Sequence, residues 1–187
     1  MDDEQRLNAM VGVQMILASI EGDPLRPELR ETPKRVVNAL IEMLDGYNAE
    51  IDSLFTTFDG EGTDQLIIIK NIPFVSLCAH HLLPFSGKTS VGYLPNGRAL
   101  GASKIPRLLS AFSHRLQMQE RIAEQIAKVI MDKLKPDGVA VVIEGVHLCM
   151  TCRGIKSSGS SMVNSVMLGR FREDATLRAE FLSLIKL

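Results

Sequence analysis

The chain has 187 residues, of which 45% are hydrophobic and 23% charged, and its formal net charge is −1. This length suffices for a buried core, and the near-neutral charge excludes the broad basic surface on which nucleic-acid-binding proteins rely. Three cysteines do not make a disulfide framework and no apolar run approaches the roughly 20 residues of a membrane span, so we expect a cytoplasmic protein without nucleic-acid or membrane partners.

The first fifty residues predict two helices. Apolar residues recur at steps of three and four between Leu7 and Ile20, which is typical of an amphipathic helix. Prolines and a glycine interrupt the pattern over residues 21–30. Thr32-Pro33 then provides an N-cap and a first-turn proline for a second helix that stops near Gly46. We therefore expect an N-terminal helical extension over residues 1–50 and a separate domain over residues 51–187.

The middle of the chain predicts strands. Residues 65–77 are rich in β-branched and aromatic side chains and predict a strand that is broken or bulged near Pro73. Residues 88–103 predict a hairpin, because Asn96-Gly97 supplies the positive φ angles that a tight turn requires.

The second half of the chain predicts one long helical region between two pairs of strands. Residues 105–134 are expected to be helical up to Pro136, with a buried apolar stripe in the later part. A strand is expected over 139–150 with its partner over 160–169, and residues 171–187 predict a closing helix. This arrangement favours an α+β fold with a mostly antiparallel sheet.

Two short motifs carry residues that bind metal ions. Cys78-x-x-His81 is a workable ligand pair for zinc, although such a pair alone is weak evidence. The segment HLCMTCRG adds Cys149 and Cys152 at the end of another expected strand, and folding can bring them to the first pair.

The cysteine count leaves two interpretations of the metal site. If Cys152 also binds, the site is closed and structural. If it does not, two cysteines and one histidine leave a coordination position for water that the metal can polarise. His80 and His147 are then free as proton carriers, a role suited to a pKa near neutrality. Either histidine taken alone is more often a hydrogen-bonded core residue.

Five blocks of sequence resemble the GTP cyclohydrolase I family, in order and at that family's intervals. The resemblance covers about residues 30–187. It implies the tunnelling fold, in which antiparallel strands backed by helices assemble into a toroidal homodecamer with active sites between subunits. The blocks are CAHHLLPFSGK, GYLPNGRALGASKIPRL, RLQMQERIAEQIA, EGVHLCMTCRG and MLGRFREDATLRAEFL.

The resemblance also implies a reaction and roles for five residues. Cys78, His81 and Cys149 match the family's ligands for one zinc ion per subunit. His80 matches the general acid that protonates the opening ring, and His147 matches a histidine that assists proton transfer. The implied activity is the conversion of GTP and water to 7,8-dihydroneopterin triphosphate and formate, the first step of folate or pterin biosynthesis.

Seven further positions match the family's contacts with GTP. A triphosphate needs local cations in a chain without a basic field. Guanine needs a carboxylate that accepts from its N1–H and its amino group. Without the resemblance, each of these residues reads as a surface charge or as the polar start of a helix. They are Ser103, Lys104, Arg107, Arg153 and, across a subunit boundary, Arg35 for the triphosphate, and Glu120 with neighbouring Gln119 for guanine.

The chain departs from the family pattern at several positions. Ala79 replaces a glutamate, Cys152 replaces an apolar residue, Asn38 stands where some relatives have lysine, and the segment after Arg153 lacks the usual threonines. An alternative is therefore a divergent paralogue that acts on a related purine or pterin, or a non-catalytic GTP-binding or regulatory subunit. A third possibility is a structural zinc domain, which requires the closed site.

Overall fold

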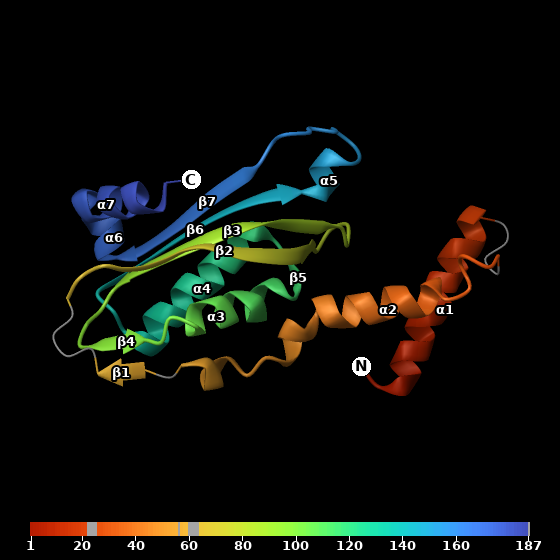
Figure 1. Ribbon diagram of the computed structural model, residues 1–187, viewed down its shortest axis with the longest axis horizontal. Coiled ribbons are helices and arrows are strands. Elements are labelled where there is room, and N and C mark those ends of the chain that lie inside the picture. Colours follow the sequence, from red (N-terminus) through yellow and green to blue (C-terminus); the bar gives the residue numbers. More distant parts are fainter. Residues whose placement is uncertain (22–25, 56, 60–63, 187) are drawn as a thin grey trace. The chain divides into compact units, whose positions relative to one another are not determined.

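The computed structural model describes residues 1–21, 26–55, 57–59 and 64–186 (Figure 1). Their contacts divide the chain into the units Met1–Asp45 and Gly46–Leu187. The first unit contains α1 (Asp3–Glu21) and α2 (Thr32–Met43), which contact one another. Both predicted N-terminal helices are thereby confirmed, while part of the expected break over residues 21–30 lies outside the described residues.

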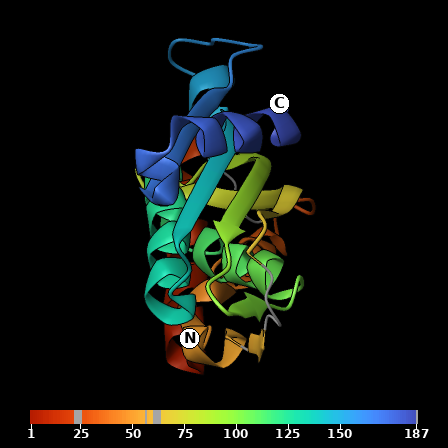
Figure 2. The same ribbon diagram turned by 90° about the vertical axis from the view of Figure 1, so that its left-hand side faces the viewer.

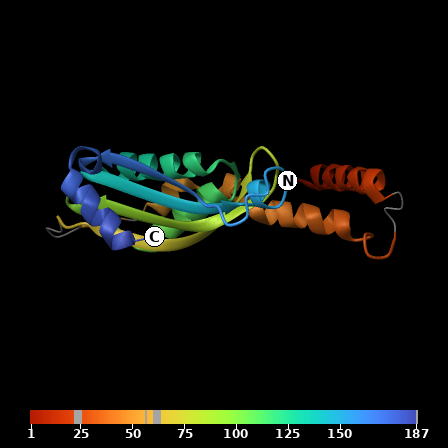
Figure 3. The same ribbon diagram turned by 90° about the horizontal axis from the view of Figure 1, so that it is seen from above.

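A five-stranded sheet forms the centre of the second unit. Its strand order is β5-β2-β3-β6-β7, and every neighbouring pair is antiparallel except β5 with β2. Figure 3 shows that the sheet curves along its strands. The strands are β2 (Ile67–Cys78), β3 (Pro84–Leu94), β5 (Leu116–Gln117), β6 (Gly138–His147) and β7 (Met162–Gly169); β1 (Thr57–Asp59) and β4 (Arg98–Leu100) pair separately.

Helices cover both faces of this sheet (Figure 2). The larger core lies between the sheet and the helices α3 (Lys104–Ser113) and α4 (Gln119–Leu134). The smaller core lies on the opposite face, beneath α6 (Arg170–Glu173) and α7 (Ala175–Ile185). Successive side chains of a strand point to opposite faces, so β6 alternates between the two cores and is buried on both sides. The α+β fold with a mostly antiparallel sheet is confirmed.

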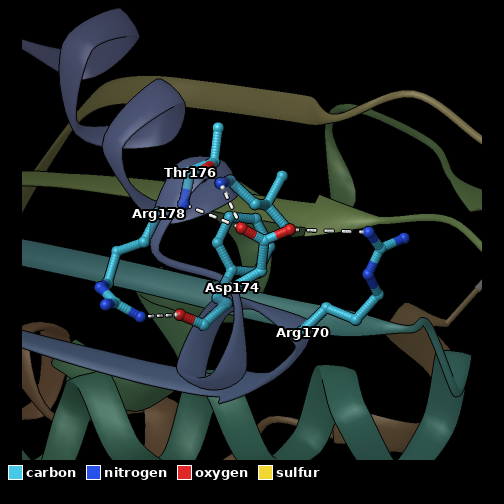
Figure 4. A network of polar contacts seen from close by, with 6 residues as sticks. Arg170, Asp174, Thr176 and Arg178 are labelled. Carbon is cyan, nitrogen blue, oxygen red and sulfur yellow. Dashed lines mark hydrogen bonds and ion pairs between the residues drawn. The ribbon is translucent and has the colours of Figure 1, made fainter.

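The closing helical segment is divided at Asp174. Its carboxylate accepts hydrogen bonds from the backbone N–H groups of Thr176 (2.8 Å) and Leu177 (3.1 Å), which caps α7 (Figure 4). Arg178 Nη1 donates to the carbonyl oxygen of Phe171 and ties α7 back to α6. The predicted closing helix is therefore present, but as two helices, because an aspartate at this position satisfies N–H groups that a continuous helix would use internally.

The predicted strand over residues 65–77 is confirmed as β2. The pairing of β2 with β3 changes register between Ile69 and Ile72, and Asn71 has a φ of +57°. The expected irregularity near Pro73 is therefore a β-bulge just before the proline.

The predicted hairpin over residues 88–103 is wrong. Asn96 keeps a negative φ and only Gly97 is in the left-handed region, at +72°, so the two-residue turn that reverses a strand directly does not form. Strand β4 leaves the sheet and pairs with β1 instead. The hairpin partner of β3 is β2, and the turn between them is residues 79–83; on its other side β3 pairs with β6.

The predicted helical region over residues 105–134 is also divided. The strand β5 separates α3 from α4 and pairs in parallel with the end of β2. The apolar spacing weakens here, because Leu116 follows Phe112 by one helical turn but the next turn, before Ile122, has the polar residue Gln119 at that position. This interruption places the start of α4 beside the metal-binding motif.

No helix in the described ranges is both long and apolar enough to cross a membrane.

Candidate metal centre and active site

Cys78 is the last residue of β2, and His81 lies on the turn that joins β2 to β3. The backbone N–H of Cys78 donates to the carbonyl oxygen of Leu83, and the N–H of Leu82 donates to the carbonyl oxygen of Cys78, both at 2.9 Å. Leu82 takes a φ of +54°, which closes the chain tightly over residues 79–83. As a result, the Nδ1 atom of His81 lies 3.7 Å from the sulfur of Cys78.

Cys149 reaches the same place from β6. The pairing of β3 with β6 sets the first residues of β3 opposite the last residues of β6. The chain then enters α5 (Leu148–Thr151), whose second residue is Cys149. The sequence placed Cys149 at the end of a strand, whereas it lies in the short helix that follows. The ligand atoms of Cys78, His81 and Cys149 all lie within 4.8 Å of one another, which confirms the predicted convergence.

This cluster fits a zinc ion. Ligands at the usual zinc–sulfur and zinc–nitrogen distances and a tetrahedral angle are about 3.5 Å apart. The separation of the Cys78 sulfur and the His81 nitrogen, 3.7 Å, is close to that value. Two thiolates and one imidazole also form a donor set that suits zinc better than harder cations.

Cys152 lies outside the cluster. Its thiol is exposed and donates a hydrogen bond to the carbonyl oxygen of Leu148 at 2.9 Å. The metal-binding group found in the described part of the chain has three members. Of the two interpretations that the sequence left open, this geometry favours the site with a vacant coordination position over the closed site with three cysteines.

The thiol of Cys149 is affected by its burial and by its charged and sulfur-containing neighbours. Burial raises the pKa of the Cys149 thiol, and the neighbouring Cys78 sulfur raises it further. The guanidinium of Arg153 acts in the opposite direction. A divalent cation between the sulfurs would favour both thiolates, so metal binding and loss of the thiol protons are coupled here.

His147 is held by two contacts. Its ring is stacked on Phe85, with centroids 4.5 Å apart and 5° between the planes. Its Nε2 lies 3.0 Å from the side-chain oxygen of Gln119. Burial lowers the pKa of His147, and the carboxylate of Glu120 opposes that shift. The ring is therefore fixed in position and favoured in its neutral form.

His80 is exposed and lies beside the metal cluster. Its Nδ1 atom is 3.9 Å from the sulfur of Cys78, and its ring meets that of His81 edge-on with centroids 6.1 Å apart. An exposed imidazole next to the ligands can exchange protons with solvent and with a bound molecule.

A cavity of about 150 Å³ connects these groups. This volume is less than the about 300 Å³ of a typical small-molecule site, so one chain encloses only part of a nucleotide. Its walls bring together both histidines, all three candidate ligands and the two residues expected near guanine. The lining residues are Cys78, His80, His81, Gln117, Met118, Gln119, Glu120, His147, Cys149 and Met162.

The residues expected to bind phosphate are less closely grouped. Arg153 is near enough to Cys149 for its charge to act on the thiol. Ser103, Lys104 and Arg107 lie at the start of α3 and are not among the described residues that line the cavity. The ten residues of α3 extend about 15 Å before the chain turns toward β5. Arg35 belongs to the first unit.

Sequence reasoning missed four residues of the site. Phe85 stacks on His147, and Gln117, Met118 and Met162 line the cavity. The signal for Gln117 was its place in the polar stretch where the helical pattern lapses. The parallel pairing of β5 sets Gln117 directly beside Cys78.

Comparison with known proteins gives consistent matches. The family model described as GTP cyclohydrolase I matches residues 9–186. A protein from Dehalococcoides mccartyi named GTP cyclohydrolase 1 is 48% identical over all of this chain and 98% of its own length. Relatives with the same name from Halalkalibacterium halodurans and Coxiella burnetii are each 46% identical over 93% of the chain and 93% and 95% of their own lengths. Among solved structures, an archaeosine synthase QueF-Like in the apo form aligns with 56% of this chain and 93% of its own, at 18% identity and a TM-score of 0.47.

Proposed function

The chain belongs to the GTP cyclohydrolase I family, and we propose that its site hydrolyses GTP to 7,8-dihydroneopterin triphosphate and formate, with consumption of one water. One observation carries this proposal. The three candidate ligands converge beside His147 and Glu120 in one cavity of a chain that matches the curated relatives over its full length. The product is the first intermediate of folate or pterin biosynthesis.

The metal of this reaction is zinc, one per subunit, held by Cys78, His81 and Cys149. When bound, zinc polarises water and lowers its pKa, which makes water a nucleophile at neutral pH. The chain's part is to provide three ligands and to leave the remaining position open, an arrangement that the exposed and separately bonded Cys152 supports.

The other cavity residues recognise guanine and transfer protons. Glu120 accepts from the N1–H and the amino group of guanine, a pair of donors that adenine lacks. His80 donates a proton to the ring as it opens, and its exposure beside Cys78 supports this role. His147 assists proton transfer near the ribose. Its stacking on Phe85 supports a fixed position for that step.

The triphosphate is bound by residues from more than one subunit. Arg153 binds the triphosphate from the same chain that provides the metal ligands. Ser103, Lys104 and Arg107 are contributed by a second copy, because they lie at the start of α3 and are not among the described residues that line the cavity of their own chain. Arg35 adds a further cation across a subunit boundary. Such shared sites require a homo-oligomer, which we take to be a toroidal decamer in the cytoplasm.

We retain residues 51–187 as the catalytic domain and residues 1–50 as a helical extension. The contact-based division between Asp45 and Gly46 lies close to that boundary.

Incubation of the zinc-loaded protein with GTP tests the proposal. Formate and a pterin that fluoresces after oxidation should appear in equal amounts. A second candidate is a GTP-binding subunit without turnover. The family's glutamate is replaced here by Ala79, whose side chain is exposed and contributes no carboxylate. Binding of GTP by zinc-replete protein without release of formate would support that candidate instead.

A further inference from the structure

Gln119 is a buried side chain that connects α4 with His147. It is the first residue of α4, and its exposed fraction is 0%. Its amide nitrogen lies 2.9 Å from the carbonyl oxygen of Met162, 2.8 Å from the side-chain oxygen of Asn164 and 3.3 Å from the carbonyl oxygen of Ile143. Its amide oxygen lies 3.0 Å from Nε2 of His147. The amide is therefore surrounded by hydrogen-bond partners within the protein.

These partners determine which way the amide points. Two of the three atoms facing the nitrogen are backbone carbonyl oxygens, which accept hydrogen bonds and cannot donate them. Turning the amide over would set its oxygen against the carbonyl groups of Ile143 and Met162 and leave buried acceptors without donors. The oxygen of Gln119 therefore faces His147.

The tautomer of His147 follows from this orientation. An amide oxygen accepts hydrogen bonds, so the Nε2 atom facing it must carry the hydrogen. In a neutral imidazole the other nitrogen, Nδ1, then carries the lone pair. Phe85 fixes the plane of the same ring by stacking at 4.5 Å. Both the plane and the hydrogen position of His147 are thus set by buried neighbours.

A glycine in β6 leaves room for this contact. A Cβ atom added at Gly145 would lie 2.5 Å from the side-chain oxygen of Gln119, well inside contact distance. Any larger residue at position 145 would push the amide away from its place. The amide of Gln119 and the glycine opposite it form one packing arrangement.

We propose that Gln119 is a positioning residue that holds His147 as the Nε2–H tautomer and keeps the lone pair of the neutral ring on Nδ1. This role rests on the proposed function, because it concerns the proton transfer assigned above to His147.

Gln119 held in this way does not take part in guanine recognition. Its amide nitrogen offers two N–H groups to three acceptors of the protein, so it has none to spare for the substrate. Recognition of the guanine edge falls to the side chain of Glu120, the next residue of α4.

The tautomer can be measured directly. The chain has four histidines, so solid-state ¹⁵N spectra of protein labelled only at histidine distinguish a ring protonated at Nε2 from one protonated at Nδ1, whatever the size of the oligomer. A His147→Asn sample identifies the signal of His147. We expect Nε2–H in the wild type at a pH where the ring is neutral. A wild-type ring protonated at Nδ1 would overturn the proposal without the need for any variant.

Two variants then test the cause. Gln119→Met removes the accepting oxygen and keeps the length of the side chain, and Gly145→Ala displaces that oxygen without removing it. In either variant that folds, we expect His147 to become a mixture of tautomers. The matched control is Gln125→Met, which removes another amide of α4 that bonds to Gln117 at 2.8 Å and not to His147. An unchanged His147 signal in the folded variants would overturn the proposal.

Kinetics distinguish positioning from substrate binding. We expect Gln119→Met to lower kcat by about 10-fold to 100-fold, as for a misplaced proton-transfer group, with KM for GTP nearly unchanged. A rise in KM at constant kcat would show that Gln119 contacts guanine and would overturn the proposal. The ¹⁵N spectra need no turnover, so they remain decisive if the chain proves not to hydrolyse GTP.

Discussion

Replacement of Phe85 by leucine tests whether packing behind the cavity holds His147 in place. Phe85 is 1% exposed, stacks on His147 at 4.5 Å, and meets Phe74 edge-to-face at 5.8 Å. Each aromatic pair contributes about 0.5–1.5 kcal/mol beyond burial, so the loss of both removes about 1–3 kcal/mol. The imperfect fit of leucine adds about 1 kcal/mol, which gives a total loss of about 2–4 kcal/mol in unfolding free energy.

The assay for Phe85→Leu combines urea unfolding with formate release. Both are measured at one protein concentration, because assembly would make stability depend on concentration. We expect kcat to fall about tenfold as well, since the imidazole of His147 loses the stacked ring that fixes its plane. Phe171→Leu is the matched control: Phe171 is fully buried in the other core, and its edge-to-face contact is with Phe181 at 5.6 Å.

The control separates stability from function. Phe171→Leu should lose about 1.5–2.5 kcal/mol, from one aromatic pair and the poorer fit of leucine, with kcat unchanged. If Phe85→Leu lost stability but kept its full kcat, the stacking would be structural only and the reasoning would be refuted.

Three further predictions test the metal ligands, the cap of α7 and the packing of β3 against β6. Cys149→Ser should abolish zinc retention and formate release, whereas Cys152→Ala should preserve both by metal analysis and turnover; the reverse pattern would indicate the closed site. Asp174 has a pKa lowered from 3.8 by backbone N–H groups at the start of α7, so its carboxylate stabilises the fold above that pH and the contribution disappears as the pH falls through the lowered value. The difference in urea midpoint between wild type and Asp174→Asn should therefore shrink on acidification, and a difference independent of pH would contradict this assignment. Gly87→Ala should prevent folding or cost several kcal/mol by circular dichroism, because its Cβ would lie 1.8 Å from the carbonyl oxygen of Glu144; normal stability would mean that β3 and β6 are not this close.

The sequence indicated most of the sheet because its strands carry strong local signals. The strands β2 and β6 are 12 and 10 residues long and rich in β-branched side chains; β6 is buried over most of its length, and β2 mainly toward its C-terminal end. The signals failed where pairing depends on distant partners. Asn96-Gly97 is a good local turn, but β4 pairs with β1, and the two residues of β5 are too few to show a period.

In the candidate site, too, local contacts were predictable from the sequence and contacts between distant segments were not. Cys78 and His81 are neighbours in sequence, so their pairing was visible from spacing alone. The approach of Cys149 depends on the pairing of β3 with β6, and only the family resemblance selected it beforehand. The contact between Gln119 and His147 joins residues 28 positions apart through an amide whose orientation depends on carbonyl groups of two other strands. No spacing rule encodes such a contact.

X-ray absorption at the zinc edge tests the central claim most directly. The account predicts two sulfur ligands at about 2.3 Å with one nitrogen and one oxygen at about 2.0 Å in zinc-loaded protein without substrate. Three sulfur ligands would show that Cys152 fills the fourth position, and the site would then be a structural one.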